Sequence, residues 1–205
     1  MYELYEYDEE APAISICTTI YNKCFIDKPN GKRQPFIDLL ASVARSDLTE
    51  VFGKGGIEWT VADYGSTDAN LQDVMDVMFP HPSCIIDLTH EAYNCGGGKD
   101  SASFVSSFEY LLFLDPDVVV PENFFSICLN QCDNGFPFVP ACTRATDVAA
   151  EGWSNMMIMN EDFLDTKGWG AHDDEVIGNQ LIASIRNKGM CVRKKPVQGF
   201  HYQRM

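Results

Sequence analysis

The sequence has few basic residues for its size. Fifteen Lys and Arg stand against thirty Asp and Glu in 205 residues, which leaves a formal net charge of −15. A protein that binds the phosphate backbone of nucleic acids needs a surplus of positive charge. Nucleic acid is therefore not an expected partner of this chain.

Long apolar runs and a secretory signal are also missing. The longest unbroken apolar runs, such as YLLFL, have about five residues, whereas a membrane-spanning helix needs about 20. The first residues, MYELYEYDEE, are acidic and have neither the basic start nor the apolar centre of a secretory signal. We therefore expect a cytoplasmic protein without a transmembrane segment.

The eight cysteines lack the spacing of a metal site. No two of them form a C-x-x-C pair, and no His spacing matches them. Cys17 in SICTTI and Cys84 in SCIIDL lie in apolar segments, where a free Cys packs as a small apolar residue. Cys128 and Cys132 are spaced to share one helix face. We expect buried, reduced thiols.

Apolar strands that alternate with amphipathic helices dominate the first half of the chain. The length favours one domain. Such alternation is typical of βαβ units and a mostly parallel sheet, and continuous apolar strands suit a sheet that helices cover on both faces. The predicted strands are 13–20, 57–63, 84–88 and 110–114, and the predicted helices are 35–46 and 71–78.

The pattern loosens after Pro121. Residues 94–98 (NCGGG) are predicted to form a loop that leads into a helix through SASFVSS. The later part of the chain is predicted to contain a helix over 121–132, a strand over 136–142, an apolar segment over 155–159 and a helix over about 173–188.

Polar side chains stand at the ends of three predicted strands. In a parallel sheet, ligands bind beyond the carboxyl ends of the strands. An Asp-x-Asp after an apolar strand offers two hard oxygen ligands to a divalent cation, and such a cation bridges phosphate oxygens. The residues concerned are Thr18, Thr19 and Tyr21 after the first strand, Asp63 after the second, and Asp115 and Asp117 after the fourth.

Five motifs stand in a characteristic order along nearly the whole chain. They are T-I-Y-N (19–22), D-Y-G-S-T-D (63–68), a Gly/Asn-rich segment (94–100), LLFLDPDVVVP (111–121) and G-W-G-A-H-D-D-E (168–175). Together they resemble the motifs of GT-A fold glycosyltransferases, in particular the family 2-like enzymes, which are inverting and metal-dependent and carry a D-x-D motif.

The resemblance implies a single α/β domain with a GT-A, Rossmann-like central sheet. It implies a nucleotide-sugar-binding half over 12–120 and an acceptor-binding half over 121–205, which follow the acidic tail over 1–11. The implied reaction moves a sugar, with inversion, from a nucleotide-diphosphate sugar to a hydroxyl of a glycan or glycoconjugate acceptor. A UDP-sugar is the first expectation for the donor, and Mn²⁺ or Mg²⁺ is the implied cofactor.

The resemblance also implies roles for residues around the nucleotide. Thr18, Thr19 and Tyr21 would surround the base, and Asp63 would accept a hydrogen bond from the uracil N–H. Lys99 would reach the uracil or the diphosphate.

The metal site is implied by three residues. Asp115 would contact the ribose or a metal-bound water, and Asp117 would ligate the metal. His201, in QGFHYQ, resembles the His that completes the metal site in many such enzymes, although it could equally be an ordinary surface residue. A divalent cation suits a protein of net charge −15, because that charge repels a diphosphate.

On the acceptor side, Asp173 matches the position of the catalytic base, and Asp174 is the neighbouring candidate. Both could instead begin a helix, where acidic residues interact well with the dipole. His172 precedes them and would contact the acceptor. Trp153 and Trp169 could stack on sugar rings or could belong to the core.

Three residues differ from the usual motifs of the family. Tyr64 stands where a second Asp is frequent, Asp100 where an Asn is usual, and His172 where a Glu is usual. They bear on the contacts to the base, the phosphates and the acceptor, respectively.

The Asp-x-Asp allows two other interpretations. A haloacid-dehalogenase-type phosphatase carries its nucleophile in a D-x-D motif after an apolar strand, which LLFLDPDVV fits. That motif ends the first strand of such enzymes, whereas two strand–helix units precede it here. A catalytically inactive sugar-nucleotide-binding module would keep the same motifs and lack turnover.

Overall fold

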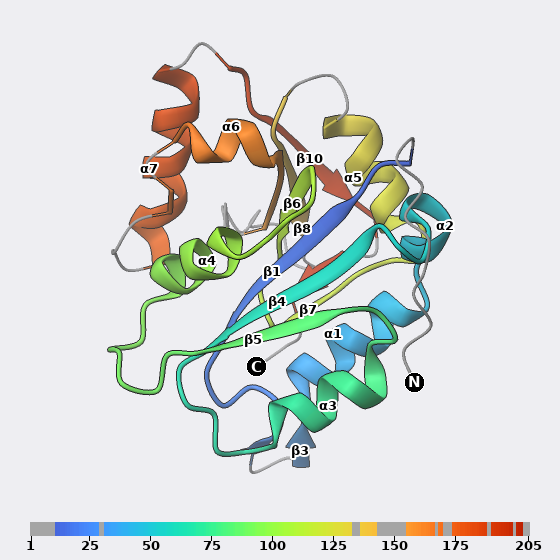
Figure 1. Cartoon of the computed structure of the whole chain (residues 1–205), viewed down its shortest axis with the longest axis vertical. Helices are drawn as coiled ribbons and strands as arrows, with labels where there is room; N and C mark the ends of the chain where they lie inside the picture. The colour runs from blue at the N-terminus through green and yellow to red at the C-terminus, as the bar shows by residue number, and fades with distance from the viewer. Residues whose placement is uncertain are drawn as a thin grey trace.

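The computed structural model describes residues 11–28, 31–132, 136–142, 155–166, 168–169, 174–187, 190–198 and 200–202. A seven-stranded sheet forms its centre (Figure 1). In spatial order its strands are β10 (Arg193–Val197), β8 (Phe138–Cys142), β9 (Met156–Met159), β6 (Tyr110–Phe113), β1 (Ile14–Ile20), β4 (Ile57–Asp63) and β5 (Ser83–Asp87).

The sheet is mostly parallel, as the sequence predicts. Strand β1 runs parallel to β4 and β6, and β4 runs parallel to β5, whereas β9 is antiparallel to both of its neighbours. The chain builds outward from β1 through β4 to β5 and then returns to place β6 on the other side of β1. The strand order thus reverses between β1 and β6, and open α/β sheets bind ligands beyond the carboxyl ends of the strands at such a point.

Helices cover both faces of this sheet. Leu111 and Phe113 of β6 pack on the face covered by α4 (Cys95–Phe104), α6 (Asn160–Leu164) and α7 (Asp174–Asn187). Leu112 packs on the other face, which is covered by α1 (Pro35–Ala44), α2 (Leu48–Phe52), α3 (Leu71–Met78) and α5 (Phe124–Cys132). In Figure 1, α4, α6 and α7 gather at the upper left, and α1 and α3 lie on the opposite side of the strands. Two covered faces explain why the central strands are continuous apolar runs.

Two short antiparallel ladders accompany the main sheet. β2 (Ile26–Lys28) and β3 (Gly31–Arg33) form a hairpin within the segment that follows β1. β7 (Val118–Val119) pairs with β11 (His201–Tyr202), so the end of the described chain returns to the segment just after Asp117.

The cysteine prediction is correct in part. Cys17, Cys128 and Cys132 are buried thiols, as expected. Cys84 is exposed, and the prediction of a buried thiol there is wrong because β5 is the edge strand of the sheet. Within the described residues, no helix is long and apolar enough to cross a membrane.

Candidate active site

The loops after β1 and β4 are joined by side-chain hydrogen bonds. Asn22 has a left-handed backbone (φ 49°), and its Oδ1 accepts a hydrogen bond from the Thr67 amide at 2.8 Å. The Asn22 amide donates to Ser66 Oγ at 3.0 Å. Asp63 Oδ1 accepts from the amide and the hydroxyl of Ser66 at 2.9 and 2.7 Å. The first two motifs therefore form one connected structure at the carboxyl edge of the sheet, and Asp63 shapes its turn.

Thr18 and Thr19 are both buried and anchor neighbouring elements. Thr18 Oγ1 accepts a hydrogen bond from the indole Nε1 of Trp59 at 3.0 Å. Thr19 Oγ1 donates to the carbonyl of Cys95 at 3.1 Å, which ties β1 to the start of α4. These contacts show how both hydroxyls hold the site together from inside the protein.

Replacing Thr18 by Val should reduce the free energy of unfolding by about 1–3 kcal/mol, because the buried indole N–H of Trp59 would lose its acceptor. Thr18→Ser keeps the hydroxyl and should cost less. Urea denaturation of the two variants and of the wild type measures the difference. Equal stability of Thr18→Val and the wild type would show that this hydrogen bond contributes nothing.

The glycine-rich segment begins a helix, and its prediction as a loop over 94–98 is wrong. The side chain of Asn94 caps α4 by accepting a hydrogen bond from the Gly97 amide at 2.9 Å. A Cβ atom on Gly98 would lie 2.5 Å from the side chain of Thr19. Glycine thus allows α4 to approach β1 closely, and this tertiary contact outweighs the low helix propensity of the glycines.

Three tyrosines gather where these loops meet. The Tyr21 and Tyr93 side chains are exposed, and their ring centroids lie 6.0 Å apart. Tyr64 is buried, its ring lies 5.2 Å from that of Tyr93, and its hydroxyl donates to the Asn94 carbonyl at 2.8 Å. Sequence reasoning missed Tyr93, because nothing in the sequence around it indicates contact with Tyr21 and Tyr64.

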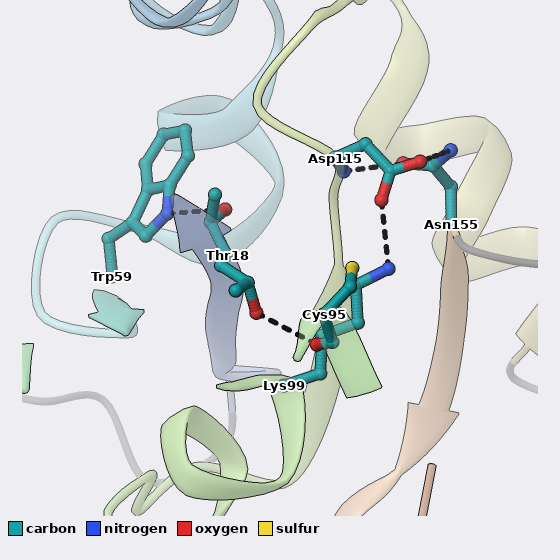
Figure 2. Close-up of polar contacts among 7 residues, drawn as sticks. Thr18, Trp59, Cys95, Lys99, Asp115 and Asn155 are labelled. Carbon is teal, nitrogen blue, oxygen red and sulfur yellow. Dashed lines mark hydrogen bonds and ion pairs between the residues drawn. The ribbon is translucent and has the colours of Figure 1, made fainter. Parts of the chain in front are cut away.

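Asp115 lies in a buried polar network (Figure 2). The Lys99 ammonium group, on a side chain that is almost fully buried, lies 2.8 Å from Asp115 Oδ1. Asn155 contacts the same residue twice: its Oδ1 accepts from the Asp115 amide at 2.8 Å, and its Nδ2 donates to Asp115 Oδ2 at 3.3 Å. Both carboxylate oxygens of Asp115 are therefore engaged within the protein. Sequence reasoning missed Asn155, which stands directly before β9.

Asp117 has a different environment. Its nearest charged partner among the described residues is Lys23, whose ammonium group lies 3.9 Å from Oδ2. Burial raises the pKa of the Asp117 carboxyl above its ordinary value, the Asp115 carboxylate raises it further, and Lys23 opposes both effects. A divalent cation beside this acidic pair, in addition to Lys23 and Lys99, would relieve the remaining repulsion.

The acidic pair fits a divalent cation that shares its ligands with a substrate. Within the described side chains, no three His, Cys, Asp or Glu residues converge on one point. Mg²⁺ sites commonly use only one or two carboxylates and take further oxygens from substrate phosphates and water. Asp117 provides such a carboxylate. The pairing of β11 with β7 sets the backbone of His201 opposite Val119, two residues beyond Asp117.

The acceptor-side candidates are described only in part. Trp169 is almost fully buried and packs edge-on against Phe113 at 5.0 Å, which favours the core interpretation of this ring. Trp153, His172 and Asp173 lie outside the described residues. Asp174 is the first residue of α7, and the description covers only its backbone, as it does for His201.

No protein-family profile and no curated protein matches the sequence. Solved structures do match. S. aureus TarS 1–349 superposes with a TM-score of 0.71 at 14% identity, over 92% of this chain and 59% of that one. The mannosyltransferase PcManGT from Pyrobaculum calidifontis, in complex with GDP-Man and Mn²⁺, gives 0.69 at 15% identity, over 94% and 59%.

A third match is glucosyl-3-phosphoglycerate synthase from Mycobacterium tuberculosis in complex with Mn²⁺ and UDP-glucose. Its TM-score is 0.62 at 12% identity, over 95% of this chain and 72% of that one. All three are glycosyltransferases of one fold. This chain has the GT-A fold. At such low identity the likeness establishes the fold alone, and the chain spans about 59% of the length of TarS 1–349.

The GT-A fold confirms the α/β class and the resemblance drawn from the motifs. It gives no support to the phosphatase interpretation of the Asp-x-Asp, because that motif follows β6 in a sheet shared with glycosyltransferases. TarS 1–349 has also been solved in complex with UDP and with UDP-GlcNAc.

Proposed function

We propose that this protein is a glycosyltransferase that moves a sugar from a nucleotide-diphosphate sugar to an acceptor hydroxyl with inversion, with the help of a divalent metal. A UDP-sugar is the favoured donor, and a glycan or glycoconjugate is the favoured acceptor. The observation that carries the proposal is the pair Asp115 and Asp117 on the segment after β6, beside the reversal of strand order in a GT-A sheet.

On the donor side, Asp117 would hold Mn²⁺ or Mg²⁺, and His201 would supply a further ligand. Such a metal neutralises charge on the diphosphate leaving group. Tyr21, with an exposed ring at the end of β1, would pack against the base. Asp115 would be held ready for the ribose by Lys99 and Asn155, because both are buried against it.

On the acceptor side, Asp173 would remove the proton of the acceptor hydroxyl as its oxygen attacks the anomeric carbon, and Asp174 is the neighbouring candidate. Support comes from the sequence position of Asp173, one residue before α7 begins. Helix α7 packs against α4, which carries Lys99. The proposed base thus directly precedes, in the sequence, a helix that neighbours the one carrying Lys99.

Calorimetric titration of the protein with UDP should show binding with Mn²⁺ and little binding with EDTA. In Asp117→Asn, the affinity for UDP should no longer depend on Mn²⁺, because the variant lacks the charged metal ligand. Asp38→Asn, at an exposed position on α1, is the matched control and should behave like the wild type.

Equal affinity of the wild type for UDP in Mn²⁺ and in EDTA would contradict the metal role. GDP is titrated in parallel, because PcManGT binds GDP-Man.

Slow release of UDP from UDP-sugars without an acceptor would distinguish an active enzyme from an inactive binding module. An aryl phosphate should not be hydrolysed.

A further inference from the structure

Two neighbouring residues of α4 hold two different loops. Lys99 pairs with Asp115, on the segment that follows β6. Asp100 contacts a different segment: its Oδ1 accepts a hydrogen bond from the backbone amide of Trp169 at 2.7 Å. Trp169 stands five residues before α7 begins at Asp174. A single turn of α4 therefore contacts both the Asp115 carboxylate and the backbone of Trp169.

The backbone around Gly168 is shaped to fit the Asp100 carboxylate. Gly168 has a φ of +69°, which disfavours any residue with a side chain. A Cβ atom at this position would lie 2.5 Å from Asp100 Oδ1, closer than non-bonded atoms approach. The Gly168 amide donates to Thr166 Oγ1 at 3.0 Å, which fixes the same turn from the other side. The Asp100 carboxylate thus occupies the space that a side chain at position 168 would need, and the glycine turn leaves that space open.

The Trp169 residue contacts both Lys99 and Asp100. The Lys99 ammonium group lies 4.8 Å from the centroid of the Trp169 ring. Trp169 is thus held at its amide by Asp100 and at its ring by Lys99, which also holds Asp115. The low exposure of Lys99 and Trp169 strengthens both contacts, because water does not screen them.

We propose that Asp100 is a positioning residue: together with Lys99 it sets the placement of the Trp169 backbone relative to Asp115. For its effect on turnover this inference rests on the proposed function, in which Asp173 acts on the acceptor and Asp115 belongs to the donor site. A transfer reaction needs both groups in one fixed geometry, and a displacement of about 1 Å is enough to slow such a reaction strongly.

The amide hydrogen of Trp169 reports this anchor directly. In Asp100→Ala it should exchange with solvent about 10–100-fold faster, because the bond to a charged acceptor is lost. Asp100→Asn keeps an oxygen acceptor and should restore most of the protection. Amide exchange measured by NMR resolves this single hydrogen.

The matched control is Asp76→Ala. Asp76 occupies the sixth position of α3, as Asp100 does in α4, and its side chain is exposed. Exchange at Trp169 should not change in this variant. Unchanged exchange in Asp100→Ala, or no recovery in Asp100→Asn, would overturn the proposal.

Kinetics separate positioning from a merely structural role. The wild type is first tested for hydrolysis of UDP-glucose, UDP-GlcNAc and GDP-mannose with Mn²⁺. The donor that it hydrolyses fastest is then used to measure kcat and KM of the variants. Asp100→Ala should lower kcat about 100-fold with KM for the donor unchanged, and Asp100→Asn should recover the rate. A rise in KM with unchanged kcat would overturn the proposal.

A double-mutant cycle keeps the proposal testable if Asp100→Ala is poorly stable. Gly168→Ala should lower the Tm more in the wild type than in the Asp100→Ala background, since the contact at 2.5 Å exists only with Asp100. Additive effects would contradict the anchor. If the wild type binds no UDP with Mn²⁺, the proposed function fails, while the exchange at Trp169 still decides whether Asp100 anchors the turn.

Discussion

Asp173→Asn should slow sugar transfer by roughly 10²–10⁴-fold and leave the affinity for Mn²⁺ and UDP nearly unchanged. The amide keeps the size and much of the hydrogen bonding of the carboxylate but cannot accept the proton of the acceptor hydroxyl. The proposed donor site uses other residues, Asp115 and Asp117, which follow β6. Initial rates of sugar transfer, measured beside calorimetric titration with UDP and Mn²⁺, separate the two effects.

Three other outcomes would contradict this role of Asp173. If Asp173 only capped a helix, the substitution would cost about 1 kcal/mol of stability and leave turnover intact. Full transfer by Asp173→Asn together with loss of transfer in Asp174→Asn would move the base by one residue. Full transfer in both variants would remove this motif from the mechanism.

The parts of the fold that the sequence predicts well are those with local signals. The strand predicted over 57–63 and the helix predicted over 71–78 coincide with β4 and α3. In β4 the signal is a run of mainly apolar residues that both covered faces of the sheet require. In α3 it is the helical spacing of apolar residues, which places Leu71 and Met75 on the buried face.

The parts that it predicts poorly depend on distant contacts. The first turn of α4 contains three consecutive glycines, and a helix forms there because Gly98 packs on Thr19, which lies in another element. β10 reads RKKPV and has no apolar pattern, yet it pairs in parallel with β8 at the sheet edge. The hairpin of β2 and β3 and the ladder of β7 and β11 are too short to leave a recognisable period.

For the candidate site, too, the sequence predicts one aspect well and another poorly. The motifs indicate that Thr18, Thr19, Asp63 and Asp115 belong near one edge of the sheet, since the ends of parallel strands meet there. They do not indicate which side chains pair. Asp115 is bound by Lys99, 16 residues before it, and by Asn155, 40 residues after it. Such pairing follows from helix and strand packing, which no short motif encodes.

The second large effect is expected for Lys99→Met. Met preserves much of the volume of the side chain but leaves the buried Asp115 carboxylate without its cation. Breaking a buried ion pair in this way costs about 3–5 kcal/mol, because the remaining charge is not compensated. Urea denaturation should show a loss of that size, with the slope of the transition unchanged. Lys32→Met, at an exposed position of β3, is the matched control and should stay within about 0.5 kcal/mol of the wild type.

The double variant Lys99→Met/Asp115→Asn tests the cause of that loss. Replacing the carboxylate by an amide removes the uncompensated charge, and Asn155 can still hydrogen bond to residue 115. The double variant should therefore be more stable than Lys99→Met alone, with an interaction energy between the two positions above about 1 kcal/mol. If the two substitutions instead destabilise additively, Lys99 acts through its packing on Trp169, 4.8 Å from the ring centroid, and not through its charge on Asp115.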